Sequence, residues 1–175
     1  MPSTIEARCA FPDATSFAVV PLDKLQSPIV RLGVDYWRLL RGSRPFPARE
    51  DVKPRDITVA LSNMVLATVI DGGNDFILRI VGDNVVRAYR APLINRRMSG
   101  IMADLPNSAR RWHELYRKVF DTKAPVGVHG IVGHDAPEVT FIESEVVALP
   151  LGASADFVDH IMTFGYRVQR GEAGL

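Results

Sequence analysis

Two short apolar runs flank a turn-forming cluster near the middle of the chain. Met64 to Ile70 and Phe76 to Gly82 are rich in β-branched side chains, and the Asp-Gly-Gly-Asn-Asp cluster at 71–75 contains residue types that tolerate positive φ. In the second run, Phe76 and Leu78 alternate onto one face. The pattern predicts a β-hairpin with at least one face that other apolar elements must cover.

Helical periodicity marks two longer segments. The first begins at Ser27-Pro28 and runs to Leu40, where the serine is expected to act as N-cap and Gly42 to end the helix. Its apolar stripe is wider than one packed face needs, so we expect it to pack on the domain, on a second copy, or on both. The second segment, Pro106 to Asp121, has apolar residues on one face and arginines opposite.

The stretches between these segments have weaker patterns. Residues 42–56 hold three prolines among charges, which predicts a stiff extended connector, and the apolar stretch 57–60 leads into the hairpin. After the hairpin we expect a short helix from Asp83 to Tyr89, followed by helical turns and loops over 90–105. The section between the hairpin and residue 121 is therefore predicted to be helical, with loops and helical turns before the long helix.

Three further strands are predicted after the long helix, at 126–132, 139–149 and 157–168. Adjacent strands joined by hairpin loops favour an antiparallel sheet, and the intervening helices then lie together on one face. The expected fold class is α+β, with a five-stranded antiparallel sheet, helices on one face and an N-terminal flanking helix.

The chain divides into four expected parts. An irregular arm covers 1–26, in which 17–20 form a short strand or a docking segment. The flanking helix and proline-rich connector cover 27–60, the main domain covers 61–168, and a tail covers 169–175.

Composition and charge narrow the class of protein. The single cysteine, Cys9, cannot form an internal disulfide, and no apolar run reaches the roughly 20 residues that span a bilayer, so we expect a cytoplasmic protein without membrane contact. Residues 79–118 hold nine positive and three negative side chains. Because no DNA-binding motif accompanies them, nucleic acid is not the expected partner. Four arginines could instead dock an acidic protein partner: Arg96, Arg97, Arg110 and Arg111.

Several short sequence motifs, in the order in which they occur, resemble those of a bacterial PAS-domain family that was formerly a domain of unknown function. They are Tyr36-Trp37-Arg38-Leu39-Leu40-Arg41-Gly42, then Arg44, Pro47, Arg49, Asp51 and Pro54, then Phe76 to Gly82, and finally Ala148-Leu149-Pro150-Leu151. The resemblance implies a five-stranded antiparallel sheet, a helical section that encloses a ligand pocket, and a sensing role. The chain departs from the family at Tyr89-Arg90 and at Asn95, where glycines are usual.

A pocket of this kind would draw on the hairpin, the short helices and the long helix. The candidates are Met64, Leu66, Leu78, Tyr89, Met98, Met102, Trp112 and Tyr116, although core packing is the favoured explanation for each. The resemblance implies that haem, where it is bound in this fold, is held by a histidine of the long helix. His113 lies on this helix, at the edge of its apolar stripe. Light-sensing relatives need a cysteine in the helical section, so flavin is not expected. The cofactor, haem or another small ligand, stays open.

No motif predicts catalysis. The chain has no nucleophile elbow and no phosphate-binding loop. Glu143 and Glu145 share a strand face and are either a pair of acids for proton transfer or solvated side chains. A metal site is conceivable where His129 and His134 lie near Asp135 and Glu138, although a solvated turn explains these residues equally well.

The sequence thus predicts a stand-alone, non-catalytic PAS-type sensory domain that binds a small ligand, a protein partner or both, and that works as a homodimer. The expected dimer contacts are Leu32, Tyr36, Trp37 and Leu40, so that Trp37→Ala should weaken dimerisation. The alternatives are a ligand-free interaction adaptor with a filled core and, less favoured, a small-molecule enzyme.

Overall fold

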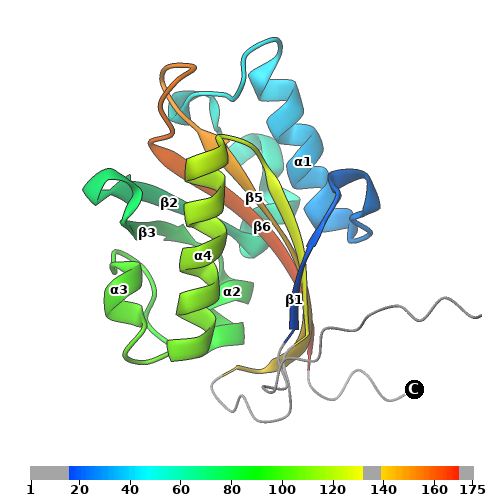
Figure 1. Ribbon diagram of the computed structural model, residues 1–175. Helices are drawn as coiled ribbons and strands as arrows, with labels where there is room; N and C mark the ends of the chain where they lie inside the picture. Colours follow the sequence, from blue (N-terminus) through cyan, green and yellow to red (C-terminus); the bar gives the residue numbers. More distant parts are fainter. Residues whose placement is uncertain (1–15, 132–138, 170–175) are drawn as a thin grey trace, which may run out of the picture.

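The computed structural model describes residues 16–131 and 139–169, which form one twisted antiparallel sheet with helices on both faces (Figure 1). The six strands of these residues follow the order β1-β4-β5-β6-β2-β3. Their bounds are β1 Ser16–Val20, β2 Met64–Ile70, β3 Asp75–Val81, β4 Val126–Ile131, β5 Phe141–Leu151 and β6 His160–Gln169. The α+β class is confirmed, with one strand more than predicted.

The additional strand comes from the N-terminal arm. β1 pairs antiparallel with β4, with Val19 opposite Val128, so the short-strand alternative for residues 17–20 is confirmed and this strand is part of the sheet. The rest of the predicted arm up to residue 15 lies outside the described residues. Of the other predicted strands, the last begins three residues later than expected, because Phe157 closes a small turn with Ser154 before β6 starts.

The predicted hairpin is confirmed as β2 and β3. Asp71 and Gly72 adopt positive φ in the short η4 turn, Asp71–Gly73, that reverses the chain. A register shift between Leu66 and Ala67 interrupts the pairing, so that Leu66 faces Ile80 but Ala67 faces Leu78. This bulge decides which side chains share a face further along the hairpin.

Three helices pack on one face of the sheet. They are α2 Asp83–Tyr89, α3 Met98–Ile101 and α4 Pro106–Thr122. Both departures from the family's glycines adopt left-handed backbone, with φ of 51° at Arg90, the C-cap of α2, and 60° at Asn95. The turns therefore keep the path that glycine would allow, with a larger side chain at each.

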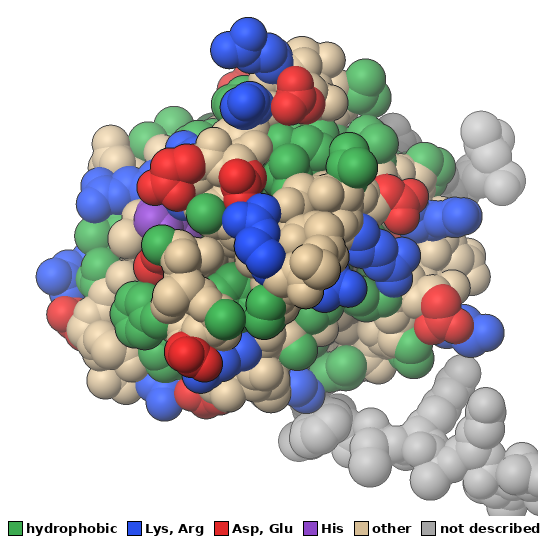
Figure 2. Space-filling view, turned by 90° about the horizontal axis from the view of Figure 1, so that it is seen from above, with side chains coloured by type: hydrophobic (Ala, Val, Ile, Leu, Met, Phe, Trp, Pro, Cys, Tyr) green, Lys and Arg blue, Asp and Glu red, His purple; other side chains and the backbone are tan. Residues whose placement is uncertain are grey.

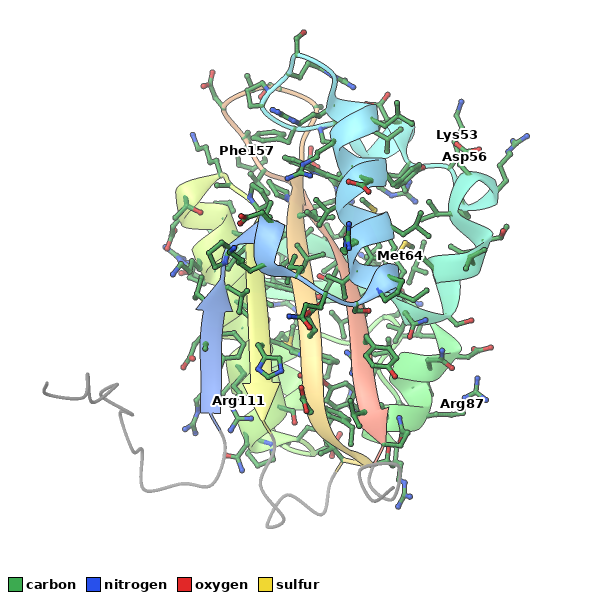
Figure 3. The ribbon with its side chains drawn as sticks, turned by 90° about the vertical axis from the view of Figure 1, so that its right-hand side faces the viewer. Lys53, Asp56, Met64, Arg87, Arg111 and Phe157 are labelled. Carbon is green, nitrogen blue, oxygen red and sulfur yellow. The ribbon has the colours of Figure 1, made fainter. Side chains whose placement is uncertain are left out.

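The opposite face is covered by α1, Pro28–Arg41, and by the 3-10 helix η3, Pro54–Asn63 (Figure 3). The two remaining 3-10 turns are η1, Leu22–Lys24, and η2, Arg49–Asp51. The prediction of an extended connector is thus wrong in part, because Pro54 starts a helical turn, a position where its missing N–H and fixed φ are tolerated. Residues 57–60 lie inside this 3-10 helix, which ends at Asn63, directly before the hairpin.

Two polar contacts hold α1 on the sheet. The indole Nε1 of Trp37 donates to the carbonyl oxygen of Pro150 at 2.8 Å, and the carboxylate of Glu145 accepts from the backbone N–H groups of Gln26 and Ser27, the latter at 2.7 Å. The Ser27 side chain forms no hydrogen bond with any described residue. The predicted serine cap is therefore wrong, and a carboxylate from β5 binds the backbone at the start of α1 instead.

Neighbouring residues on β6 point to opposite faces of the sheet. Phe164 lies against Gly33 of α1, where a Cβ atom would come within 2.2 Å of the phenylalanine ring. Thr163 instead donates from its hydroxyl to the hydroxyl of Tyr116 on α4, at 3.0 Å. The sheet therefore separates two apolar layers, one under α1 and one under α4.

Candidate functional site

The predicted pocket residues divide between the two layers. Met64 pairs with Phe164 and Leu66 with Met162, which places both on the α1 face. Leu78 lies beyond the bulge, opposite Ala67, and therefore on the α4 face with Tyr116. The structure does not bring the eight candidates together around one pocket.

The candidates on the α4 face pack closely against one another. The rings of Tyr89 and Trp112 are 4.4 Å apart and edge to face, and Tyr89 meets Phe141 at 5.3 Å. The guanidinium of Arg167 lies over Tyr89 at 5.2 Å and over Phe141 at 5.6 Å, distances typical of cation–π contacts. The cavity beside Trp112 measures about 40 Å³, room for water but not for a cofactor.

Tyr116, Met98 and Met102 complete the core under the helices. Burial raises the pKa of the Tyr116 hydroxyl well above its usual range, although the hydroxyl of Thr163 donates to it. Met98 is fully buried and Met102 half-buried. Tyr116 is therefore a neutral hydroxyl that accepts one bond from the sheet.

His113 belongs to a contact between α4 and the hairpin turn. Its Nε2 lies 2.7 Å from the carbonyl oxygen of Asn74, so this nitrogen carries the proton and donates. Arg117, one turn further along α4, donates to the carbonyl of Gly73 and to the side chain of Asn74. Together the two residues fix the turn against the helix.

Asp75 is a buried carboxylate that the sequence reading did not single out. It accepts from the hydroxyl of Ser99 at 2.6 Å, from the Ser99 N–H at 3.1 Å and from the Phe76 N–H at 2.8 Å, with Arg97 at 3.8 Å. Burial alone would raise the pKa of Asp75, but these hydrogen bonds and the arginine outweigh it and hold the pKa below 3.8. The carboxylate thereby ties α3 to β3.

This depressed pKa predicts a loss of stability in acid. The ionised carboxylate stabilises the fold fully above 3.8, and this contribution should disappear as the pH falls through the lower pKa of the folded state. In urea unfolding, wild type should therefore be more stable than Asp75→Asn at pH 7, and the difference should shrink below pH of about 4. Asp104→Asn, which removes an exposed carboxylate, is the control. A difference that stays constant with pH would contradict the assignment.

The arginines proposed for docking have different surroundings. Arg96 pairs with Asp104 at 2.6 Å and Arg97 with Asp71 at 2.9 Å, so both already hold carboxylates of their own chain. Arg110 and Arg111 lie on the first turns of α4, and Arg110 is exposed. At the end of the molecule seen in Figure 2, basic and acidic side chains are interspersed with hydrophobic ones. Docking of a partner at Arg110 and Arg111 stays a prediction.

The acidic and histidine candidates lie on the α1 face of the sheet. His129 and Glu143 form an ion pair at 2.7 Å across β4 and β5, and Glu145 binds the backbone at the start of α1. His134, Asp135 and Glu138 lie outside the described residues. Within the described ranges no group of three or more histidine, cysteine or acidic side chains is arranged to hold a metal ion.

The proposed dimer contacts on α1 also differ in exposure. Tyr36 and Trp37 are buried within the chain itself, where the Tyr36 hydroxyl accepts from the Lys53 N–H at 2.9 Å, so neither side chain is available to a second copy. Leu40 is half-buried and Leu32 is 39% exposed. Leu39, which was not proposed, is 79% exposed and lies two helical turns from Leu32 on the same side of α1.

A surface groove that the sequence reading missed lies between α2 and the end of β6. It has a volume of about 720 Å³. Its lining residues are Asn63, Asn84, Arg87, Arg90, Val139, Thr140, Tyr166, Arg167 and Gln169. The two walls are about 80 positions apart in the sequence, so local patterns gave no signal for it.

Comparison with known proteins agrees with this fold. Within the described ranges, no helix is both long enough and apolar enough to cross a membrane. A family model described as a PAS domain matches residues 26–166, which includes α1 and five of the six strands. No curated protein and no solved structure matched the chain. Because the match covers most of the 175 residues, the chain belongs to the PAS domain family.

Proposed function

We propose that this PAS domain is a non-catalytic sensory and interaction module that acts as a homodimer and passes its signal through α1. The match of residues 26–166 to a PAS domain model is the observation that supports the sensory role. The match includes α1 together with the sheet on which α1 packs. The signal would be a shift of α1 between two packings on the sheet, driven by a ligand or partner that binds the two states with different affinity. We also keep the division into a flanking segment, 27–60, and a PAS-like body, 61–168.

The exposed side of α1 supports the homodimer. Leu32 and Leu39 present apolar surface there, with the ion pair between Asp35 and Arg38 beside them at 3.6 Å. A two-fold axis parallel to α1 and beside these leucines would bring each leucine against its counterpart on the second copy, in an isologous interface. This surface replaces the one proposed from Tyr36 and Trp37.

The dimer can be tested by replacing these leucines with charged residues. Leu32→Glu combined with Leu39→Glu should convert a particle of twice 19.3 kDa into one of 19.3 kDa, because it places like charges across the axis. Sedimentation equilibrium over a range of concentrations measures the mass. Ile94→Glu, at an exposed apolar position between α2 and α3, is the control and should stay dimeric. A wild type that is monomeric at all concentrations would overturn the proposal.

The close packing under α4 bears on the ligand. Tyr89, Trp112, Phe141 and Arg167 fill the space where a PAS-type pocket was expected. This favours the adaptor alternative over an enclosed cofactor in the helical layer. A small ligand would then have to bind at the surface.

A further inference from the structure

The groove between α2 and β6 results from the unequal lengths of neighbouring strands. β2 begins at Met64, which pairs with Phe164, so residues 165–169 of β6 have β5 on one side and no strand of the described residues on the other. α2 lies across this gap, and the backbone N–H of Thr140 donates to the carbonyl oxygen of Ala88. Figure 3 shows Arg87 projecting from α2, which lies beside the end of β6.

Among the described residues, the charged side chains that line this groove are all positive. Arg87, Arg90 and Arg167 line it, and no aspartate or glutamate of the described residues does. Arg87 donates only to neutral oxygens, the carbonyl of Asp83 and the side-chain amide of Asn84, and within the described ranges none of the three arginines forms an ion pair. By contrast, Arg44, Arg96 and Arg97 each pair with an aspartate. Three unpaired guanidinium groups around one groove favour an anion there.

Arg167 is positioned to act as the innermost contact. Its guanidinium lies over Gly165, where a Cβ atom would come within 3.1 Å of Nη1, and it is held between Tyr89 and Phe141. Of its five N–H donors, only Nη1 has a protein acceptor among the described residues, the carbonyl of Gly165 at 3.5 Å, and its buried Nε has none. An arginine fixed by stacking with donors to spare is suited to paired bonds with a carboxylate or phosphate.

We propose that this groove binds a small anion that carries at least two carboxylate or phosphate groups. Arg87 and Arg90 hold one group at the α2 wall, and Arg167 holds the other at the β6 wall. Asn63, Asn84 and Gln169 supply neutral polar contacts between them. The inference deepens the proposed function by naming its ligand class, and it rests on that function for the ligand's role as a signal.

Isothermal titration calorimetry with citrate and with pyrophosphate, at constant ionic strength, tests the binding. Arg87→Gln with Arg90→Gln should weaken binding roughly tenfold or more, because charged hydrogen bonds are lost. The control, Arg110→Gln with Lys118→Gln, removes two positive charges from exposed positions of α4 and should bind as wild type does. Binding of citrate alone would identify a carboxylate ligand, and binding of pyrophosphate alone a phosphate ligand.

A second readout reports on Arg167. Trp112 packs on Tyr89, which packs on Arg167, so a bound anion should change tryptophan emission, whereas Trp37 on the other face gives a constant background. Arg167→Lys keeps the positive charge but loses the planar guanidinium group. This variant should bind the anion more weakly, and adding the anion should change its tryptophan emission little.

Two results would overturn the inference. They are the binding of neither anion at millimolar concentration, and an equal loss of affinity in the groove and control variants. Sedimentation of the same samples separates this failure from that of the proposed function. A dimer that binds no anion refutes only the groove, and a monomer that binds anions refutes only the homodimer.

Discussion

Trp37→Ala should lower the free energy of unfolding by about 3–5 kcal/mol. The indole is 4% exposed and packs between α1 and the sheet, so truncation removes a large apolar contact and leaves a cavity. It also leaves the carbonyl oxygen of Pro150 without its donor at 2.8 Å. Urea unfolding followed by far-ultraviolet circular dichroism measures the change.

Trp37→Phe separates the two contributions. Phenylalanine keeps much of the apolar contact but cannot donate to Pro150, so its cost should be clearly smaller than that of alanine. If Trp37→Ala left stability unchanged and altered only the mass in solution, then Trp37 would be a dimer contact, as first predicted from the sequence, and the packing described above would be wrong.

Gly33→Ala should also destabilise the fold, by about 1–3 kcal/mol, although alanine is normally the better residue in a helix. The added Cβ would lie 2.2 Å from Cδ2 of Phe164, a side chain that is fully buried. α1 would have to move away from the sheet, which loosens the whole apolar layer between them.

The matched control is Gly100→Ala in α3, where a Cβ atom would meet nothing within 4 Å. That variant should be neutral or slightly stabilising in the same urea experiment. Combining Gly33→Ala with Phe164→Leu should cost less than the sum of the two single changes, because a smaller side chain makes room for the methyl group. Strict additivity would show that the two residues do not compete for the same space.

Local patterns were sufficient where the structure depends on near neighbours. Strand alternation located β2 and β3, and helical periodicity located α1 and α4. The ordering of these elements along the chain also predicted the α+β class, because consecutive strands usually lie side by side.

A single irregularity of the sheet separates the three hairpin residues that were predicted to share a pocket. Without a bulge, Leu78 would face Thr68 and share a side with Met64 and Leu66; the shift between Leu66 and Ala67 moves it to the other layer. Nothing in the residue types at this point marks the bulge. Alternation within one strand is visible in a sequence, but the register between two strands is not.

Contacts between distant segments were also beyond the sequence. Glu145 accepts from Ser27 across 118 positions, and β1 pairs with β4 across a similar span. Glu145 could be interpreted as a solvated acid, because alternation assigns it to a face of the strand but does not show what covers that face. The sequence pattern did not single out Arg87 or Arg167 either, since only the fold places them in one groove.

The two attachments of α1 restrict how this helix can move. Glu145 and Pro150 are five positions apart on β5, about 17 Å, while Ser27 and Trp37 are ten positions apart along α1, about 15 Å, so helix and strand run side by side between two matched fixed points. A slide by one helical turn would break both attachments at once. If only the contacts of Glu145 are released, Trp37 stays attached to the sheet, and the N-terminal end of α1 can rotate away from the sheet about this fixed point. A signal that repositions α1 should therefore act first on its N-terminal end.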